Sequence, residues 1–312
     1  MRKVYLVTGG AGFIGSNIVE ELVRRKEAVK VIDSFITGKK ENIRPFLDKI
    51  ELVRGDIRSG SDMKKALKGV DIVLHQAAFR SVPKSVEDPE LTNDVNVTGT
   101  LNVLLTSKNA GVERLVYASS SSVYGDAKTF PQKEDQRVNP ISPYAVSKLA
   151  AENYCSVFNK IYSLQTVSLR YFNVFGPRQN PESKYSAVIP AFISVMLAGR
   201  PPVIDGTGKQ LRDFTYVKNV VEANIAAAHK RGAAGQVINI ACGRCYPVSF
   251  IVEVLNRLMN TDIEPVFGPK RAGDVFKTNA GIARMRQVLG ISPSVGFVDG
   301  LSKTLEWFKS RR

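Results

Sequence analysis

Thr8-Gly9-Gly10-Ala11-Gly12-Phe13-Ile14-Gly15 is the stretch that decides the fold of this 312-residue chain. The apolar residues 3–8 that lead into it predict a buried strand. After it, Ile14, Ile18 and Leu22 recur at helical spacing. A strand, a glycine-rich turn and a helix let a pyrophosphate approach the N–H groups at the helix start, as in dinucleotide-binding folds. The predicted cofactor contacts in this stretch are Gly9, Gly12, Phe13, Ile14 and Gly15.

A second apolar run, residues 28–32, ends at Asp33. An acidic side chain at the end of the second strand can accept hydrogen bonds from both hydroxyls of the adenosine ribose, and it repels a 2′-phosphate. Asp33 therefore favours NAD over NADP. A simple turn residue is the alternative interpretation, and the nearby Lys39 and Lys40 also bear on the choice of cofactor.

The alternation of strands and helices continues along the first half of the chain. We expect strands at 50–54, 70–74, 114–117 and 165–170, and helices at 62–68, 93–109 and from 142 onward. Repeated β-α-β units predict a doubly wound α/β fold with a parallel sheet, the Rossmann architecture. In such sheets the ligand lies at the carboxyl ends of the strands, and the polar clusters of this sequence stand at those ends.

The stretch Ser142-Pro143-Tyr144-Ala145-Val146-Ser147-Lys148 predicts a helix start, because Ser142 can accept a hydrogen bond from a free N–H and Pro143 suits the first helical position. Tyr144 and Lys148 are four residues apart and share one helix face. A nearby ammonium and the helix N-terminus favour the phenolate. Lowering a tyrosine pKa by about three units needs roughly 4 kcal/mol. Tyr144 is therefore a candidate proton acceptor, although the same spacing also occurs on solvated helix faces.

The composition bounds the partners of the protein. Lys and Arg number 44 against 29 acidic residues, a net charge of +15, which suggests anionic partners or a generally cationic surface. The basic residues are scattered, so nucleic acid is the weaker interpretation. No apolar run reaches the ~18–20 residues of a membrane span. We therefore predict a phosphorylated small-molecule substrate, with neither nucleic acid nor a membrane as partner.

Three cysteines, Cys155, Cys242 and Cys245, bear on compartment and metal binding. Cys242 and Cys245 have C-x-x-C spacing, but no second pair or nearby histidine completes a metal site, so no metal is predicted. Inert thiols and a redox pair remain the two interpretations of this spacing. The chain enters its first strand directly, with no signal peptide, and we expect a reducing cytoplasm.

The character of the sequence changes after Gly176-Pro177, where turns become denser and the alternation becomes irregular. We predict a Rossmann domain over residues 1–175 and a smaller C-terminal α/β substrate lobe over 176–312. Within that lobe, residues near 236–241 are expected to return as a strand to the main sheet.

With the glycine-rich stretch and Tyr144-Ala-Val-Ser-Lys148 in hand, the chain resembles the extended short-chain dehydrogenase/reductase family. Within it, the sequence is similar to the UDP-hexose 4-epimerases, especially those that accept N-acetylated sugars. The resemblance covers essentially the whole chain, and its most specific parts are residues 119–126, 142–148, 170–177 and 212–214. It implies a bound NAD whose nicotinamide takes a hydride from C4 of the sugar while Tyr144 takes the 4-hydroxyl proton. The 4-keto sugar then turns over, and the hydride returns to its other face.

The resemblance assigns further residues position by position. Tyr144, Lys148 and Ser120 would be catalytic: Ser120 would bond the 4-hydroxyl, with Ser121 as its alternative, and Lys148 would hold the nicotinamide ribose. Further cofactor contacts would be Asp56, Ile57, Ala77, Ala78, Arg80, Asn96, Tyr144, Lys148 and Phe172. Substrate contacts would be Ser81, Ser120, Ser121, Asn173, Val188, Val203, Asp205, Arg212, Arg271 and Thr278. The two arginines also fit by chemistry, because guanidinium forks suit a diphosphate, although simple salt bridges are the alternative.

Neighbouring branches of the family differ at identifiable positions. Dehydratases and decarboxylases of nucleotide sugars place acidic residues in the stretch that here reads Ser120-Ser121-Ser122. UDP-glucuronate 4-epimerases resemble this chain there and remain the nearest rival. A non-catalytic NAD-binding regulator is the alternative from another class, and intact Ser120, Tyr144 and Lys148 count against it.

The resemblance also implies a homodimer built from the helices at 93–109 and after 142. Both helices carry apolar residues beyond one face, including Leu101, Leu104, Leu149 and Tyr154. It further places Thr278, seven positions after Arg271, beside the 2-substituent of the sugar. A small residue there would leave room for an N-acetyl group. The alternatives are that Thr278 is only a turn residue before a helix from Ala280, or that Phe276 fills the space.

Overall fold

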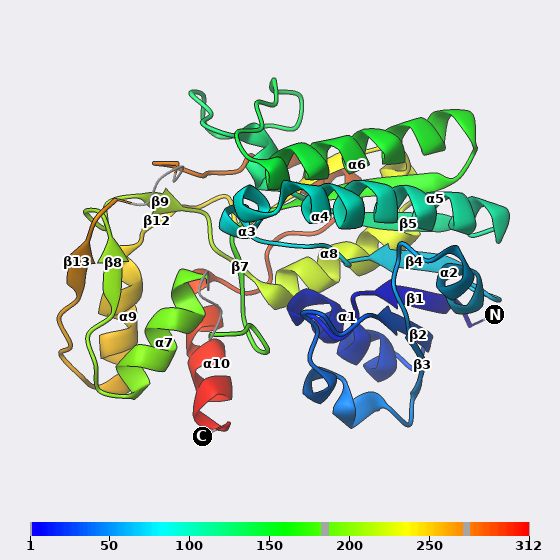
Figure 1. The fold of residues 1–312 in the computed structure, drawn as a ribbon. Helices are drawn as coiled ribbons and strands as arrows, with labels where there is room; N and C mark the ends of the chain where they lie inside the picture. Colours follow the sequence, from blue (N-terminus) through cyan, green and yellow to red (C-terminus); the bar gives the residue numbers. More distant parts are fainter. Residues whose placement is uncertain (1, 182–186, 271–274, 312) are drawn as a thin grey trace.

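The computed structural model of the protein describes residues 2–181, 187–270 and 275–311. A seven-stranded sheet forms its centre, with all neighbouring strands parallel. The strand order is β11-β6-β5-β4-β1-β2-β3 (Figure 1). Its strands are β1 (Val4–Thr8), β2 (Ala28–Asp33), β3 (Ile50–Arg54), β4 (Ile72–His75), β5 (Arg114–Ser120), β6 (Gln165–Tyr171) and β11 (Val237–Ile240). The chain winds outward from β1 in both directions, which confirms the predicted doubly wound fold.

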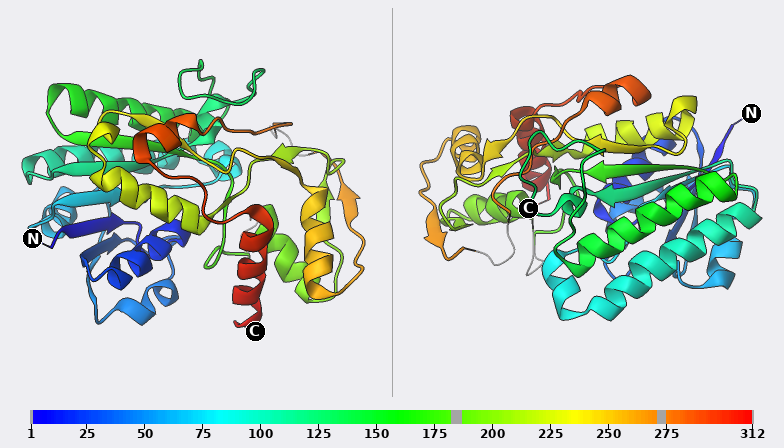
Figure 2. Two further views of the ribbon diagram at one scale, coloured as in Figure 1. Left: turned by 180° about the vertical axis from the view of Figure 1, so that it is seen from behind. Right: turned by 90° about the horizontal axis from the view of Figure 1, so that it is seen from above.

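Helices cover both faces of this sheet, because alternate residues of each buried strand point to opposite sides. On β1, Tyr5 and Val7 join the core beneath α1 (Phe13–Arg24) and α8 (Val217–His229). Leu6 points to the other face and packs with the helices α2 (Gly60–Ala66), α5 (Gly99–Asn109) and α6 (Pro143–Ile161). The view from above in Figure 2 shows α5 and α6 side by side along one face.

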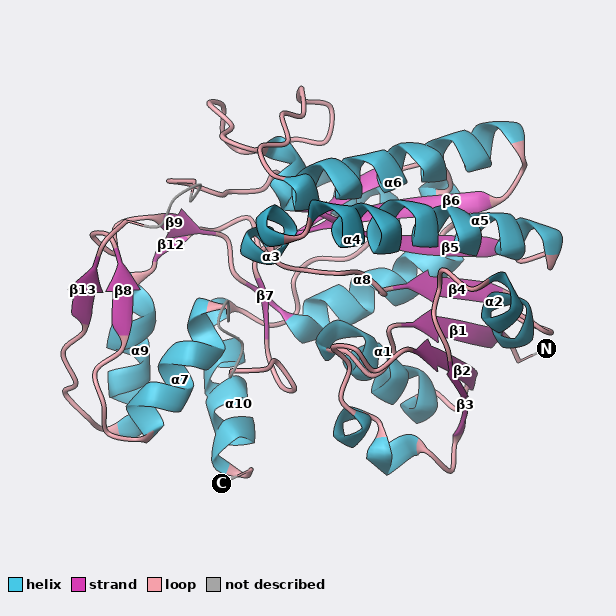
Figure 3. Cartoon of the chain, viewed as in Figure 1, coloured by secondary structure: helices cyan, strands magenta, loops and turns pink. Residues whose placement is uncertain are grey.

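A smaller lobe lies beside the carboxyl edge of the sheet (Figure 3). Its helices are α7 (Val188–Leu197), α9 (Ser249–Met259) and α10 (Phe297–Lys309). Its two-stranded ribbons pair β8 (Val203–Asp205) with β13 (Val266–Gly268), and β9 (Leu211–Arg212) with β12 (Tyr246–Pro247). A third ribbon, β7 (Val174–Phe175) with β10 (Thr215–Tyr216), joins the lobe to the sheet. The chain leaves the sheet after β6, returns with α8 and β11, and leaves again.

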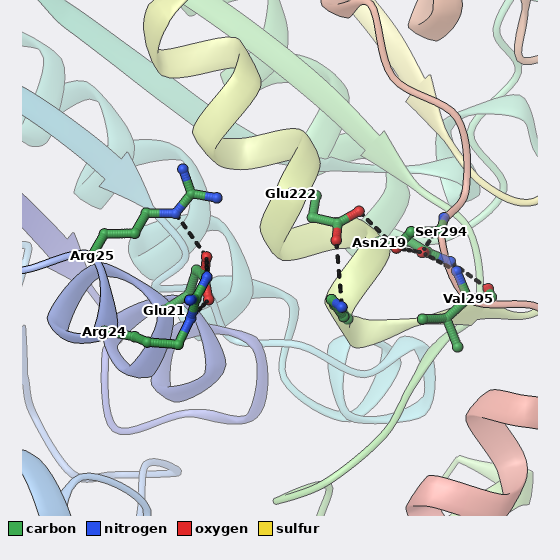
Figure 4. A network of polar contacts seen from close by, with 8 residues as sticks. Glu21, Arg24, Arg25, Asn219, Glu222, Ser294 and Val295 are labelled. Atoms are coloured by element: carbon green, nitrogen blue, oxygen red, sulfur yellow. Dashed lines mark hydrogen bonds and ion pairs between the residues drawn. The ribbon is translucent and has the colours of Figure 1, made fainter.

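The sequence predicts one of the two elements with which the chain returns to the sheet. β11 pairs in parallel with β6 at the position expected for residues near 236–241. α8 also packs on α1 and on the strands β4, β5, β6 and β11, so this helix of the C-terminal half belongs with the sheet. Figure 4 shows the contact between α8 and the segment that leads into α10. Asn219 on α8 accepts the N–H groups of Ser294 and Val295, each at 3.0 Å.

Two predicted helices differ in the structure. The helix expected over 93–109 is split into α4 (Pro89–Asn93), a π-helical turn at Asp94–Thr98, and α5. In that turn the Asn96 amide bonds the backbone of Phe79 and the Ser147 hydroxyl, a set of long-range contacts that helical periodicity does not encode. No helix begins at Ala280, which instead forms an isolated bridge with Gln132. The next π-helical turn is Met285–Leu289.

Five short helical elements complete the part of the chain described here. Three of them are α3 (Val82–Glu87) and the 3-10 turns at Ser121–Tyr124 and Arg231–Ala233. Two further 3-10 turns, Lys40–Asn42 and Arg44–Phe46, follow β2. α3 and the turn at Ser121–Tyr124 both pack on α6, so they surround the start of the helix that carries Tyr144.

Candidate active site

The glycine-rich turn brings α1 directly against the end of β1. A side chain at Gly15 would place its Cβ 2.2 Å from the carbonyl oxygen of Gly9, so only glycine allows this approach. Gly9 has a φ of +65°, a left-handed conformation that glycine adopts at little cost. The start of α1 thus presents its free N–H groups to an open space with no side chain in between, which is the arrangement that binds a pyrophosphate.

A cavity runs from this turn along the carboxyl edge of the sheet. Thirteen of the fifteen predicted cofactor residues line it: Gly9, Gly12, Phe13, Ile14, Gly15, Asp33, Asp56, Ile57, Ala77, Ala78, Arg80, Tyr144 and Lys148. The other two lie outside the lining. Asn96 is buried and holds Phe79, which itself lines the cavity. Phe172 is fully buried and packs against the ring of Tyr124.

Asp33 lies at one end of this cavity with its carboxylate already organised. One oxygen accepts the N–H of Ala11 at 2.9 Å and the other accepts that of Phe35 at 2.8 Å. Burial raises the pKa of Asp33, while these two N–H donors act in the opposite direction. A Cβ at Gly38 would lie 2.6 Å from the Asp33 carboxylate, so the loop after β2 closes tightly over it. The carboxylate is thereby fixed where a ribose would meet it.

The end of β4 forms the middle of the cavity and is held by a buried histidine. The Thr8 hydroxyl accepts the N–H groups of Gln76 and Ala77 at 3.2 and 3.1 Å. His75 bonds the same hydroxyl at 2.7 Å and Thr100 at 3.0 Å. Burial lowers the pKa of His75 to about 3, so this histidine is neutral at physiological pH. It fixes the backbone that approaches the glycine turn and has no proton to exchange there.

Tyr144 and Lys148 line the other end of the cavity, and Ser120 lies next to Tyr144 but is not among the lining residues. Ser142 caps α6 by accepting the N–H of Ala145 at 3.2 Å, and Pro143 follows it as predicted. The ammonium of Lys148 donates to the carbonyl of Ala118 at 2.7 Å and lies 6.0 Å from the centre of the Tyr144 ring. Ser120 forms a hydrogen bond with the phenol of Tyr144. β5 and α6 thus bring the three expected residues together.

The electrostatics of this group differ from the sequence-based expectation. Burial raises the pKa of Tyr144, and the Ser120 hydrogen bond and the charge of Arg80 oppose that rise without cancelling it. Burial lowers the pKa of Lys148 to about 7. The ammonium of Lys148 donates to the carbonyl of Ala118. The sequence predicted that Lys148 would lower the pKa of Tyr144, but Ser120 and Arg80 are the groups that act in this direction.

Ser120 is well placed to donate a proton outward. Its oxygen accepts the N–H of Ser122 at 3.1 Å and the hydroxyl of Ser122 at 2.9 Å. Since both lone pairs are engaged, the Ser120 hydroxyl proton points away from the turn. Ser121 is partly exposed at the start of the same 3-10 turn and lines neither of the two cavities described here.

A second cavity is lined by residues of β7, α7, β8 and β9 in and beside the smaller lobe. Five predicted substrate residues line it: Asn173, Val188, Val203, Asp205 and Arg212. Arg212 is nearly buried and donates to the carbonyls of Leu211 and Phe276 at 3.0 and 3.2 Å. Tyr171, at the end of β6, lines the first cavity, and Asn173 lines the second. The last residue of β6 and the residue two positions after it therefore line different cavities.

The remaining predicted substrate residues lie elsewhere. The Ser81 hydroxyl caps α3 by accepting the N–H of Lys84. The Thr278 hydroxyl is buried and bonds Asn173 and the N–H of Asp213. Phe276 is 64% exposed, so it does not fill the space beside Thr278. Arg271 lies outside the described residues.

Sequence reasoning missed several residues of the first cavity. These are Ser34, Ile36, Thr37 and Gly38 after β2, together with Gln76, Phe79, Leu91, Val95, Ser119 and Tyr171. Gln76 and Tyr171 stand at strand ends, so the rule that located Asp33 could have found them. The sequence of the loop 34–38 contains no comparable pattern, because the position of this loop depends on the close approach of Gly38 to the Asp33 carboxylate.

Fold and site together define a dinucleotide-binding enzyme. Residues 5–241 match the model of the NAD-dependent epimerase/dehydratase family. The chain belongs to this family, and NAD is its cofactor. The residues present fit that cofactor, because the glycine turn is free of side chains and Asp33 is fixed at the ribose end.

Individual relatives cover the whole chain. A UDP-glucose 4-epimerase of Mycolicibacterium smegmatis is 37% identical over 98% of both chains. The structure of a UDP-N-acetylglucosamine 4-epimerase from Methanobrevibacter ruminantium, in complex with UDP-N-acetylmuramic acid, is 38% identical, with a TM-score of 0.95 over 100% of this chain and 99% of that one. A UDP-N-acetyl-α-D-glucosaminuronate decarboxylase of Bacillus cytotoxicus is 30% identical over 99% of this chain and 98% of its own. The expected class, an enzyme of the epimerase type, is confirmed.

Two findings bear on the predicted partners. Within residues 2–181, 187–270 and 275–311, no group of three or more histidine, cysteine or acidic side chains is arranged to hold a metal ion. Among the helices of these residues, none has the length and apolar character needed to cross a bilayer.

Asp33→Ala tests the ribose end of the cavity. We expect NAD affinity to fall about tenfold or more, since hydrogen bonds to a charged group contribute ~1.5–3 kcal/mol. NADP affinity should fall less, because the substitution also removes repulsion of the 2′-phosphate. Fluorescence titration of cofactor-free protein with each dinucleotide measures both constants. Equal weakening of the two would show that Asp33 acts only on the fold of the loop.

Proposed function

We propose that the protein is a UDP-sugar 4-epimerase that interconverts UDP-glucose with UDP-galactose and UDP-N-acetylglucosamine with UDP-N-acetylgalactosamine. The observation that carries the proposal is the nearness in the chain of two cavities: Tyr171, the last residue of β6, lines one, and Asn173, two residues later, lines the other. One is lined by the glycine turn, Asp33 and Tyr144, and the other by Asn173 and Arg212. A dinucleotide in the first cavity and a nucleotide sugar in the second would bring their reacting ends together near Tyr144.

The residues of the site have distinct tasks in such a reaction. Bound NAD supplies a hydride acceptor and donor. Tyr144 takes the proton of the sugar 4-hydroxyl and returns it after the 4-keto sugar has turned over. The Ser120 oxygen accepts two hydrogen bonds from Ser122, so Ser120 has one proton to donate: this proton goes to the Tyr144 phenol in the free protein and would be redirected to the sugar 4-oxygen on binding. Arg80, whose charge lowers the pKa of Tyr144, stabilises the phenolate. Arg212 offers a planar fork for a diphosphate.

The residues around Tyr144 favour epimerisation over the other reactions of the family. The B. cytotoxicus relative is a decarboxylase, so family membership alone does not fix the reaction. Elimination or decarboxylation requires a further acid or base, and the turn Ser120-Ser121-Ser122 supplies hydroxyl groups in place of carboxylates. A site that only removes a hydride and a proton, and then returns both, needs no more than Tyr144 and Ser120.

The proposal is tested by incubating the purified protein separately with UDP-galactose, UDP-N-acetylgalactosamine and UDP-glucuronate. Chromatography of the product sugars should show the 4-epimers of the first two. Turnover of UDP-glucuronate alone would replace the proposed substrates with those of the rival branch. Absence of any turnover by NAD-loaded protein would favour a non-catalytic NAD-binding regulator.

Tyr144→Phe isolates the proton-exchanging group. We expect epimerisation to fall by ~10²–10⁴-fold, the usual contribution of general acid–base catalysis. NAD binding and the unfolding temperature should stay near those of the wild type, because the ring is retained. Steady-state kinetics, NAD titration and calorimetry measure the three properties. Activity within a few-fold of wild type would remove Tyr144 from the mechanism.

The N-acetylated substrates rest on Thr278 and on the M. ruminantium relative. A threonine at this position is much smaller than a tyrosine, and its buried hydroxyl lies against Asn173, which lines the second cavity. The relative named as a UDP-N-acetylglucosamine 4-epimerase has the same fold over the full chain. Both observations support a pocket that admits a bulky 2-substituent.

Thr278→Tyr should close that pocket. Overpacking typically costs 1–3 kcal/mol, so we expect kcat/KM for UDP-N-acetylgalactosamine to fall by about tenfold or more. The value for UDP-galactose should fall less, because this sugar lacks the N-acetyl group and its binding loses only what the Thr278 hydroxyl contributes through Asn173. The comparison is made by assaying both substrates with the same enzyme preparation. An equal loss on both would show that Thr278 supports the loop and does not border the 2-substituent.

The family resemblance also supports a homodimer formed by α5 and α6. Tyr154, Val157 and Ile161 follow one another at helical spacing on α6 and are 37%, 41% and 68% exposed. Leu105 on α5 is 43% exposed, whereas the expected Leu104 is buried. The two helices lie side by side (Figure 2), and we infer that their exposed apolar side chains contribute to one surface.

Light scattering at micromolar concentration should give the mass of a dimer, and the double variant Val157→Asp/Ile161→Asp should give that of a monomer. Charges on this surface would be buried without partners in a dimer, which is strongly unfavourable. The matched control is Val266→Asp, on an exposed apolar position of β13, and it should remain dimeric. A monomeric wild type would contradict the proposal.

A reducing cytoplasm is the proposed compartment. All three cysteines, Cys155, Cys242 and Cys245, are free thiols in the structure. Cys155 is buried in the core between α6 and the sheet, where a small apolar thiol serves packing.

A further inference from the structure

Asp213 is a fully buried carboxylate between β9 and β10 that neither the hydride nor the proton transfer uses. It accepts three backbone N–H groups, from Cys242 at 3.0 Å, Gly243 at 3.0 Å and Ala280 at 3.2 Å. Cys242 and Gly243 lie in the segment that follows β11, and Ala280 lies in the segment between β13 and α10. The carboxylate therefore joins three parts of the chain that are 29 to 67 residues apart.

The backbone of Asp213 takes part in the same arrangement. Its N–H donates to the Thr278 hydroxyl at 3.3 Å, and its carbonyl accepts the Asn173 side-chain amide at 3.0 Å. The same amide nitrogen donates to the Thr278 hydroxyl at 2.9 Å. Asn173 holds a φ of +31°, a strained conformation for a residue with a side chain. Such strain persists only where the surroundings fix the residue, and Asp213 and Thr278 provide that fixation.

The arrangement is electrostatically unfavourable for a group with a purely structural task. Burial raises the pKa of Asp213 to about 7, although the three N–H donors oppose the rise. A buried carboxylate held by N–H dipoles carries a desolvation cost that an apolar side chain would avoid. The hydrogen bonds of the carboxylate fix the positions of the neighbouring residues. Arg212 precedes it directly, and both Arg212 and Asn173 line the second cavity.

We propose that Asp213 is the positioning residue of the second cavity, holding Arg212 and Asn173 in the geometry that receives the diphosphate of the nucleotide sugar. This inference rests on the proposed function. The carboxylate acts through the residues it fixes and does not touch the substrate. Its loss should therefore weaken nucleotide binding more than it slows the chemical step.

Asp213→Asn is the nearly isosteric test. An amide has one acceptor oxygen, so at least one of the three N–H groups loses its partner, and the new NH₂ group faces a donor. We expect the Kd for UDP, measured by calorimetry on NAD-loaded protein, to rise about tenfold or more. KM for UDP-galactose should rise similarly, while kcat and NAD affinity stay within about threefold of wild type.

A second variant keeps the inference testable if Asp213→Asn does not fold. Thr278→Val removes the hydroxyl that Asp213 and Asn173 share but leaves the carboxylate in place, and it should also weaken the binding of UDP. The matched control is Asn256→Ala in the same lobe. Asn256 accepts the N–H of Ile263 and the Thr261 hydroxyl and donates to the Ile263 carbonyl, and it lines neither cavity.

The outcomes separate the two proposals. Weak UDP binding in the Asp213 or Thr278 variant, with normal binding in Asn256→Ala, supports the positioning role. Wild-type UDP affinity in both of those variants, or equal weakening in the Asn256 control, overturns it. If the wild-type protein itself does not bind UDP, the proposed function is wrong, and the positioning role is rejected with it.

Discussion

The parallel pairing of seven strands is the constraint on which the site depends. Because all strands run in one direction, their carboxyl ends meet along a single edge, and the order reverses on either side of β1. Thr8, Asp33, His75, Ser120 and Tyr171 are the last residues of their strands. Residues from distant parts of the sequence therefore lie along the same edge of the sheet. The glycine turn makes this edge usable, since any side chain at Gly15 would collide with Gly9.

Burial of charged groups is the main electrostatic feature of this edge. Burial lowers the pKa of Lys148 and raises the pKa values of Tyr144 and Asp33. Neighbouring hydrogen-bond donors offset only part of the rise at Tyr144 and Asp33. Beneath the site, Glu152 follows Lys148 by one helical turn and pairs with Arg170 at 2.6 Å, while Ser119 donates to the same carboxylate at 2.6 Å. This pair joins α6 to β5 and β6, the elements that carry the reacting residues. The site is therefore organised before any ligand arrives, at a cost that the surrounding core must offset.

Periodicity and short motifs predict what is local in this protein. The strands, the glycine turn, the cap at Ser142 and the shared face of Tyr144 and Lys148 all follow from residues within one or two turns of each other. The break at Asp94–Thr98 does not, because it accompanies contacts of Asn96 with Phe79 and Ser147. The Asp213 arrangement likewise joins residues up to 67 positions apart, which no local pattern encodes. The pKa of Tyr144 fails to follow from sequence for the same reason, since burial is a property of the folded chain.

The central claim is that one site removes hydrogen from C4 of a UDP-sugar and returns it to the opposite face. The most direct measurement is epimerisation of UDP-glucose carrying deuterium at C4, with the UDP-galactose product analysed by NMR and mass spectrometry. If the cofactor retains the hydride within the closed site, the product keeps its deuterium at C4 and the reaction needs no external oxidant or reductant. Loss of the deuterium to water, or a requirement for stoichiometric NAD, would contradict the account.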